Sequence, residues 1–408
     1  MDSETVVSEV PVELIDQAVP SRIRSTSPLH EPRALTAAER ERFRESARRA
    51  REAKSAAMRG EGASPLHPIN VPSLNPYDLM PQLEGKGLRS LSLFSGGGGL
   101  DIGFERAGFE HVASYEIMED AAATLVKARP DWQVFGGDDG DVRKVDWRQW
   151  RKKVDVLHGG PPCQPFSHAG RQRGALDPRD MWPEFVRATL EIMPAAFVGE
   201  NVAALADSKF SEYVAQQIIA PLSEKYTVMP VTVLHAADFG IPQVRRRVFF
   251  IGFRTKVAAR RYKVPAPTHN RPGAVPVEGL LTGVGVRSAL GLPEIGFDDL
   301  SPTIRSTLNG PRNTTSILNS VSAKKKFELL KIWPNGVALT REAAQKFVAQ
   351  NGHFRLSVPD VALIQGFPED WPFVGATYMV LGQIGNAVPP PLGYRVAKAV
   401  AEALAGKK

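Results

Sequence analysis

Residues 91–101 read Leu91-Ser-Leu-Phe-Ser-Gly-Gly-Gly-Gly-Leu-Asp101, so an apolar run passes through four consecutive glycines into a helix-forming segment. Glycines allow tight turns and a close approach of the backbone to a ligand, and the N-terminus of the following helix carries a partial positive charge. A strand, a glycine turn and a helix in this order are typical of the first unit of a parallel α/β sheet. A glycine-rich turn without a ligand is the alternative interpretation.

A carboxylate follows this turn at a spacing that suits a nucleoside. Glu116 ends the next apolar run, eighteen residues after Gly98. A carboxylate at the end of the second strand accepts hydrogen bonds from two ribose hydroxyls. The dinucleotide fingerprint is incomplete, because Asp101 stands where a third glycine is expected after Gly96 and Gly98. The pattern therefore favours S-adenosyl-L-methionine, which has no pyrophosphate, over a nicotinamide dinucleotide.

Short apolar runs alternate with helical segments from residue 88 onwards. This alternation predicts an α/β fold with a doubly wound, mostly parallel sheet. After residue 253 the alternation stops, and a stretch rich in Gly, Pro, Ser, Thr and Asn predicts a smaller, loop-rich module over 254–354. The predicted strands are 91–94, 112–117, 154–157, 196–199, 228–234 and 248–253, and the predicted helices are 120–129, 182–192, 211–222 and 391–405.

Composition excludes several classes of protein. The chain has 408 residues, of which 43% are hydrophobic and 23% charged, as in ordinary globular proteins. It has no apolar run of 18 residues and no typical signal peptide, so we expect no membrane span and a cytoplasmic location. The single cysteine, Cys163, excludes internal disulfides and a zinc site built on several thiolates. The eight histidines show no ligand spacing, so no metal is expected.

The net charge of +7 is unevenly distributed. Residues 254–354 hold fifteen basic and six acidic side chains, a surplus of +9, and residues 31–60 hold nine and five. A basic block beside a near-neutral body indicates a surface for a polyanion, with a solvated basic face as the alternative. Residues 1–87 are expected to be an N-terminal extension: a disordered start, a charged helix capped by Thr36 and Glu39, and a linker over 60–87.

The cysteine lies in a rigid loop after a predicted strand, in Val154-Asp-Val-Leu-His-Gly-Gly-Pro-Pro-Cys163-Gln-Pro-Phe-Ser167. Prolines on both sides stiffen the loop, as a positioned nucleophile requires, whereas a structural cysteine more often lies inside an apolar run. Glu200 ends another predicted strand, and a parallel neighbour would bring its carboxylate to the same sheet edge. A thiol and a carboxyl group can divide nucleophilic attack and proton transfer between them.

These motifs, taken in order, resemble the DNA (cytosine-5)-methyltransferases of bacterial modification systems, a family with a Rossmann-like fold. The resemblance runs from about Ser90 to Ala403, interrupted by 254–354. It departs from the family at Trp182, where leucine is usual, and at Arg355-Leu-Ser-Val-Pro-Asp360. The matching motifs are Phe94-Ser-Gly-Gly-Gly-Gly-Leu-Asp101, Glu116, Gly140-Asp141-Val142, Gly160-Pro-Pro-Cys163-Gln-Pro-Phe-Ser167, Asp177-Pro-Arg179, Glu200-Asn-Val202, Phe239-Gly-Ile-Pro-Gln243-Val-Arg245-Arg-Arg247, Gln365-Gly-Phe-Pro368 and Gln383-Ile-Gly-Asn386-Ala-Val-Pro-Pro390.

The resemblance implies S-adenosyl-L-methionine as cofactor, no metal, and double-stranded DNA as substrate. Cys163 would attack C6 of a flipped cytosine, Glu200 would bind its N3 and amine, and Arg247, with Arg245 nearby, would contact O2. The implied cofactor residues are Phe94, Gly96, Gly98, Leu100, Glu116, Ile117, Asp141, Val142, Pro162, Asn386 and Val388. The implied DNA contacts are Gln164, Ser167, Gln243, Arg305, Thr307, Arg312 and Asn313.

The resemblance also implies an organisation and partners. A catalytic domain that binds the cofactor is expected over 88–253, a target-recognition domain over 254–375, and a segment that returns to the catalytic domain over 376–408. The expected partners are duplex DNA and a restriction endonuclease that acts on the same site, and the expected state is a monomer. Three alternatives remain: a related enzyme that methylates tRNA, a catalytically silent DNA-binding protein, and a nicotinamide-dependent enzyme.

Overall fold

An eight-stranded sheet forms the centre of the computed structural model, which describes residues 36–42, 44–45, 48, 52, 69–162, 179–305, 315–318, 320–345 and 353–405. The strand order is β3-β2-β1-β4-β5-β8-β6, and β7 also pairs with β8. The first five strands of this order are parallel, whereas β8 is antiparallel to β5, β6 and β7. The bounds are β1 (Leu88–Leu93), β2 (Phe109–Glu116), β3 (Val134–Gly136), β4 (Val156–Gly159), β5 (Ala196–Val202), β6 (Thr227–Val228), β7 (Thr232–His235) and β8 (Arg246–Phe253).

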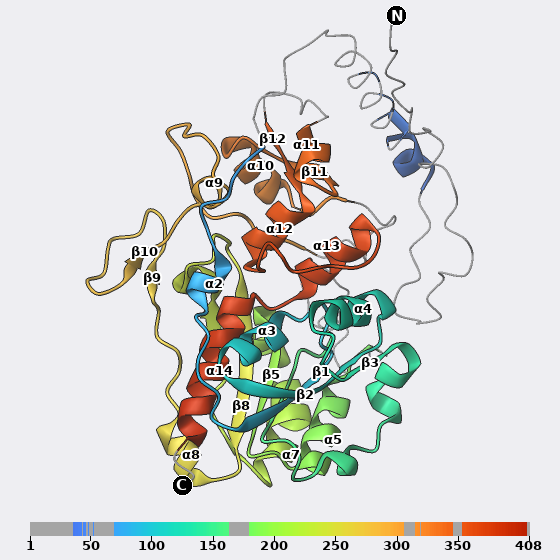
Figure 1. Cartoon of the computed structure of the whole chain (residues 1–408), viewed down its shortest axis with the longest axis vertical. Helices are drawn as coiled ribbons and strands as arrows, with labels where there is room; N and C mark the ends of the chain where they lie inside the picture. Colours follow the sequence, from blue (N-terminus) through green and yellow to red (C-terminus); the bar gives the residue numbers. More distant parts are fainter. Residues whose placement is uncertain are drawn as a thin grey trace, which may run out of the picture.

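Both faces of the sheet are covered by helices, as the doubly wound fold predicts (Figure 1). Neighbouring residues of one strand belong to opposite cores: Val156 joins one hydrophobic cluster and Leu157 the other. Because side chains alternate along a strand, this pattern requires apolar cover on both faces. The helices are α3 (Gly99–Arg106), α8 (Lys256–Arg261) and α14 (Pro390–Leu404) on the first face and α5 (Trp182–Ile192) and α7 (Ala220–Ser223) on the second, with α4 (Glu119–Ala128) near β2 and β3.

The last helix packs directly against the first helix of the sheet. A Cβ built at Gly103 of α3 would lie 2.5 Å from the backbone nitrogen of Tyr394 in α14, and one at Gly99 would overlap the carbonyl oxygen of Val388. Glycines four residues apart lie on one helix face, so α3 offers α14 a surface without side chains. Part of the glycine turn therefore serves helix packing rather than a ligand.

The expected loop-rich module shares its core with the catalytic sheet. Residues 263–386, which we call the second part, contribute Leu290, Ile332 and Leu363 to the same hydrophobic cluster as Ile102 and Leu392. The helix α8, which follows residue 254, packs on β8 and α14 and so belongs to the sheet layer. The second part contains β9 (His269–Asn270), β10 (Leu281–Thr282), α9 (Val286–Ala289), α10 (Val321–Leu329), β11 (Ile332–Ala338), α11 (Arg341–Gln345), β12 (Phe354–Ser357), α12 (Val358–Gln365) and α13 (Thr377–Asn386).

The prediction of a linker over 60–87 is wrong for its described residues, 69–87. This segment contains α2 (Pro76–Leu79) and buries Met80 completely. Its Pro and Gly content indicated a loop, but composition does not show what a loop packs against. The predicted capping box is confirmed: the amide of Glu39 donates to Thr36 Oγ1 and the amide of Thr36 donates to Glu39 Oε2.

Several element boundaries differ from the predictions for local reasons. The single strand predicted over 228–234 is interrupted around Pro230, which cannot donate to a strand ladder, and becomes β6 and β7. The helix predicted over 211–222 contains a π turn at Val214–Ile219 just before Pro221, which has no N–H. The short strand β3 was not predicted. Trp182 is fully buried in the core against Gly199, Phe185 and Phe250.

We predict that Gly103→Ala destabilises the protein, because its methyl group would collide with the backbone of α14. Overpacking of a tight core contact costs about 1–3 kcal/mol, so thermal unfolding should shift downwards by a few degrees. Gly85→Ala is the matched control, since its added Cβ would meet only the carbonyl oxygen of Gly108, at 3.6 Å. Equal melting temperatures for the two variants would contradict the proposed packing.

Three buried polar residues, Asp101, Ser114 and His158, lie in the apolar interior. Ser114 donates its hydroxyl to Asp101 Oδ1 at 2.9 Å, and His158 stacks on Phe104 with ring centroids 3.9 Å apart. Burial raises the pKa of Asp101 to about 6 and lowers the pKa of His111 to about 4. Burial also lowers the pKa of His158 well below its usual range, so this imidazole is neutral in the folded protein.

His158 should make the fold sensitive to acid. Below about pH 6.5, His158 becomes protonated in the unfolded chain but stays neutral in the folded protein. At about pH 5.5 this difference lowers the free energy of unfolding by about 1.4 kcal/mol. Asp101, whose pKa is raised, stabilises the folded state as the pH falls. Because Asp101 is present in both the wild type and the His158 variant, its contribution cancels in the comparison. We predict that the melting temperature falls more between pH 7.5 and 5.5 in the wild type than in His158→Leu. Parallel pH profiles would refute this assignment.

Candidate active site

The carboxyl ends of the parallel strands bring the predicted site residues to one edge of the sheet. Phe94 follows β1, Glu116 ends β2 and Pro162 follows β4, while Glu200 lies near the end of β5. The registers of β1 with β2 and β4, and of β4 with β5, place these strand ends side by side. The edge that the sequence predicted as the ligand site is therefore formed by neighbouring strands.

The glycine turn and Glu116 hold each other in position. The amide of Gly96 donates to Glu116 Oε2 at 2.7 Å, and the amide of Met118 donates to Oε1 at 2.8 Å. Phe94 and Gly96 both have φ near 55°, the left-handed region, and a Cβ built at Gly96 would meet nothing within 4 Å. Burial raises the pKa of Glu116, against the two amides, which lower it. The turn thus leaves open space beside a buried carboxylate.

Residues of the second part cover the glycine turn. The indole N–H of Trp371 donates to the carbonyl of Gly97 at 2.9 Å, and its ring lies against Gly98. Phe373 and Gln383 pack on Gly97. The sequence analysis missed these three contacts, because 274 residues separate Trp371 from Gly97 and no local pattern links them.

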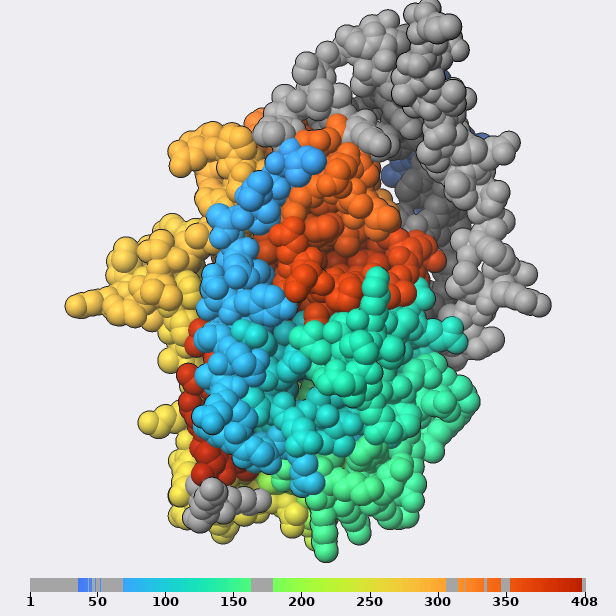
Figure 2. Space-filling view, in the orientation of Figure 1, coloured from blue at the N-terminus to red at the C-terminus, as the bar shows by residue number. Residues whose placement is uncertain are grey.

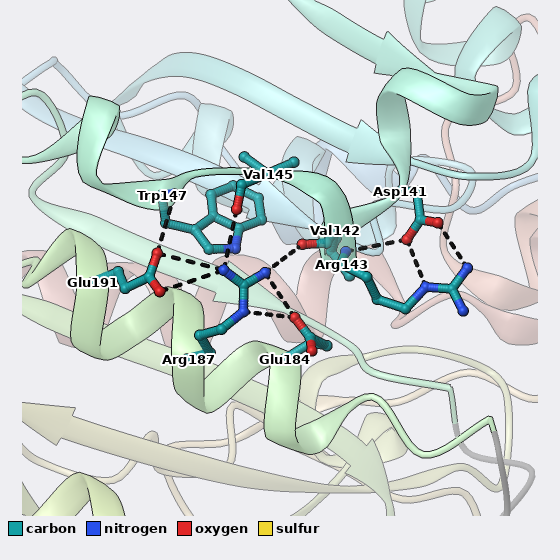
Figure 3. Close-up of polar contacts among 8 residues, drawn as sticks. All are labelled: Asp141, Val142, Arg143, Val145, Trp147, Glu184, Arg187 and Glu191. Atoms are coloured by element: carbon teal, nitrogen blue, oxygen red, sulfur yellow. Dashed lines mark hydrogen bonds and ion pairs between the residues drawn. The ribbon is translucent and has the colours of Figure 1, made fainter.

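Asp141 is bound by a neighbouring arginine (Figure 3). Arg143 Nη2 lies 2.7 Å from Asp141 Oδ2, and its Nε donates to Oδ1 at 2.8 Å. The hydrogen bond from Arg143 is the main cause that lowers the pKa of Asp141. This carboxylate, one of the implied cofactor residues, is therefore ionised and already partly engaged. Arg143 was not predicted as part of the site, although it stands two residues after Asp141.

A second arginine ties this turn to α5 (Figure 3). Arg187 donates to the carbonyls of Val142 and Val145, at 2.8 and 3.1 Å, and forms ion pairs with Glu184 and Glu191. Two carbonyls and two carboxylates satisfy its guanidinium fork. The position of Val142 is thus fixed by α5, with which it shares the hydrophobic cluster on the second face of the sheet.

Glu200 and Arg247 form a buried ion pair, with 2.6 Å between Glu200 Oε1 and Arg247 Nε. Both side chains are less than a tenth exposed. The other carboxylate oxygen, Oε2, would lie 2.8 Å from a Cβ at Gly160, so a side chain there would displace the carboxylate. Burial raises the pKa of Glu200, whereas the charge of Arg247, and then that of Arg245, lowers it. On balance the pKa of this carboxyl group is raised, and it lies beside the loop that leads to Cys163.

Asn201 fixes the start of the proline loop. Its amide donates to the carbonyl of Pro161 at 3.0 Å, and its side-chain oxygen accepts from the amide of Val202. The sequence motif contained Asn201, but no role followed from the motif alone. Cys163, Gln164 and Ser167 lie outside the described residues.

Arg245 is buried and binds backbone rather than the open edge. It donates to the carbonyls of Ile304, Gly385 and Ala387 at 2.8–3.0 Å. Gln243, predicted to contact DNA, is fully buried and binds Gln365 and the backbone of Ile304 and Ile364. A motif indicates residue type and order but not the direction of a side chain, so this expectation differs from the structure.

The remaining predicted residues divide between the edge and other positions. Asn386 is exposed at the end of α13, Val388 lies against Gly99, and Leu100 packs in the core near Gly393. Ile117 directly follows β2 and is half-buried, and Arg305 is half-buried with its amide bonded to Ile317. Thr307, Arg312 and Asn313 lie outside the described residues. Among the described residues, no helix is long and apolar enough to span a membrane.

Comparison with known proteins identifies the family. The model of the C-5 cytosine-specific DNA methylases matches residues 88–402. The Type II methyltransferase M.NgoMIV of Neisseria gonorrhoeae is 34% identical over 317 residues, which cover 77% of this chain and 97% of that protein. M.Eco47II of Escherichia coli is 32% identical, with 77% and 79% covered.

Solved structures agree in fold. A DNA modification methyltransferase encoded in an Escherichia coli prophage superimposes with a TM-score of 0.53 and 22% identity, covering 78% of this chain and 99% of that one. DNMT2 of Spodoptera frugiperda gives 0.51 and 17%, covering 77% and 99%. At these identities the likeness concerns the fold alone. Because the family model spans most of the chain, this protein belongs to the C-5 cytosine-specific DNA methylases and is a DNA (cytosine-5-)-methyltransferase.

Proposed function

We propose that the protein methylates C5 of a cytosine flipped out of double-stranded DNA at a specific sequence, with S-adenosyl-L-methionine as cofactor and Cys163 as covalent nucleophile. The observation that carries this proposal is the buried Glu200–Arg247 ion pair against Gly160, three residues before Cys163. We further propose that it is the modification enzyme of a restriction–modification system, with a restriction endonuclease that acts on the same site.

The sheet edge fits the cofactor. The space at Gly96 and the buried carboxylate of Glu116 suit a nucleoside, with Phe94 beside them for an adenine ring. When bound, S-adenosyl-L-methionine supplies an electrophilic methyl group on a sulfonium. Glu116 would accept the ribose hydroxyls, and Asp141, although bound by Arg143, keeps lone pairs for an amino group. Trp371 and Phe373 of the second part pack against the glycine turn and stabilise its conformation.

C5 of cytosine is too weak a nucleophile to take a methyl group directly, and addition of a thiolate to C6 activates it. The Cys163 thiolate adds to C6, and the electron pair of the C5–C6 double bond moves to C5, which then takes the methyl group. A base removes the proton from C5, the double bond re-forms and the thiolate leaves. Methyl transfer would leave the thioether S-adenosyl-L-homocysteine, and Cys163 is regenerated for the next turnover.

Glu200 and Arg247 would stabilise the charge that this addition places on the ring. A carboxyl group with a raised pKa donates a hydrogen bond to N3 and accepts one from the exocyclic amine, and the guanidinium faces O2. The pair is already buried and oriented, so little reorganisation accompanies the reaction. A stacked base cannot reach this edge, so the cytosine must leave the duplex. The +9 surplus over 254–354 supports binding of the DNA backbone.

We predict that Cys163→Ala abolishes methylation but retains cofactor binding. Bisulfite sequencing of DNA from cells that express the wild type should show protected cytosines in one sequence context, and none for the variant. Isothermal titration with S-adenosyl-L-methionine should give equal dissociation constants for both proteins. Full activity of the variant would refute the covalent mechanism. Methyl label found in tRNA but never in duplex DNA would refute the substrate.

We predict that Glu200→Gln lowers kcat by about 100-fold or more, because the amide cannot supply a proton to N3. The change also leaves Arg247 as an unpaired buried charge, so the melting temperature should fall. Cofactor affinity is the internal control and should remain within about twofold, since Glu200 lies beside Gly160 and not beside Glu116. Single-turnover methyl transfer measures the effect, and an unchanged rate would exclude Glu200 from the reaction.

A further inference from the structure

Residues 69–83, which precede the region matched by the family model, run across the outside of both parts of the molecule. We call this segment the strap. Figure 2 shows it as a blue band that passes from the second part, above, to the catalytic sheet layer, below. Residues 84–87 connect the strap to β1, the strand that leads into the glycine turn.

The upper end of the strap is bonded to the second part through buried groups. Asn70 is 7% exposed, and its side-chain amide donates to Asp360 Oδ1 at 2.9 Å and to the carbonyl of Leu290 at 3.0 Å. The amides of Ser73 and Leu74 both donate to the carbonyl of Ala289. A Cβ at Gly291 would overlap the carbonyl oxygen of Val71, so the two backbones are in direct contact.

Asp360 is the point at which the strap meets the helices of the second part. It is fully buried, caps α12 through Ser357, and accepts from Arg341 Nε at 3.0 Å. Asp360 ends the stretch 355–360, over which the sequence departs from the usual family motif. The aspartate therefore joins α11, α12 and the strap in one buried polar cluster, in which Asn70 is the partner that comes from outside the family region.

The lower end of the strap is bonded to the sheet layer. Arg106 at the end of α3 donates to the carbonyl of Met80 at 2.8 Å and lies over the ring of Tyr77, and the amide of Leu83 donates to Arg106. Met80 is fully buried. The strap thus has rigid attachments at both ends, one on each part.

We propose that the strap fixes the orientation of the second part relative to the catalytic edge, and that Asn70 is the positioning residue for DNA recognition at its upper end. This inference rests on the proposed function, in which the second part reads the DNA sequence. A reading surface must be held within a fraction of an ångström of the reacting edge for the correct cytosine to be selected. Loosening its attachment should therefore affect DNA binding and site choice, and not cofactor binding.

The test compares three full-length variants with the wild type in steady-state methylation of plasmid DNA. Asn70→Ala removes both buried hydrogen bonds, and Ser73→Ala removes a single one, from its hydroxyl to the carbonyl of Ser288. Gln82→Ala is the control at the lower end, where the side chain bonds to Leu83 and Glu105. For Asn70→Ala we expect KM for DNA to rise about five- to tenfold, with kcat and the cofactor dissociation constant within about twofold. Bisulfite reads should show more methylation at sites with one mismatch.

Each result decides the question. Ser73→Ala should shift the same quantities in the same direction by less, and it carries the test alone if Asn70→Ala does not fold. Suppose that the wild type is active, and that Asn70→Ala and Ser73→Ala have the same KM for DNA and the same site choice as the wild type. The strap then has no role in recognition, even if the melting temperature changes. Equal effects of Gln82→Ala would also overturn the assignment to Asn70. A wild type without activity on DNA would instead overturn the proposed function, and this inference with it.

Discussion

A single guanidinium joins the segments on which the site depends. Arg245 binds carbonyls that lie 59, 140 and 142 residues away along the chain: that of Ile304 inside the second part, that of Gly385 in the last turn of α13, and that of Ala387 just after α13. Its planar fork suits this task, because one rigid group can donate to several acceptors in fixed directions. Arg247, two residues later, meets Glu200. Where β8 begins, one arginine binds backbone and the other pairs with the carboxylate that we propose acts on the cytosine.

The candidate site gathers buried charge where the fold can tolerate it. Glu200 is compensated by Arg247, and Glu116 by two backbone amides. A buried ion pair contributes little net stability, since the loss of hydration offsets most of the attraction between the charges. Such groups are better understood as preorganised dipoles and charges for a reacting ligand than as stabilising contacts.

Local sequence signals predicted the sheet, the glycine turn and the two carboxylates at its edge. Each of these features is encoded within about ten residues by glycine, by apolar runs and by the position of a strand end. Contacts between distant residues left no such signal: 290 residues separate Asn70 from Asp360, and 274 separate Trp371 from Gly97. Gln243 shows a further difficulty, because its motif was found but its burial was not. The Pro-rich segment before β1 was mistaken for a linker, since turn residues also occur in ordered, packed loops.

The contact between α3 and α14 has a consequence for how the protein is made. The glycine face of α3 (Gly99–Arg106) is synthesised long before its cover, α14 (Pro390–Leu404). On the ribosome the first strand–helix unit must therefore wait, with apolar surface uncovered, until α14 has emerged. Transiently exposed apolar surface makes incompletely folded chains prone to aggregation. Biogenesis of this enzyme should depend on chaperones that shield α3 and the strands beside it during synthesis.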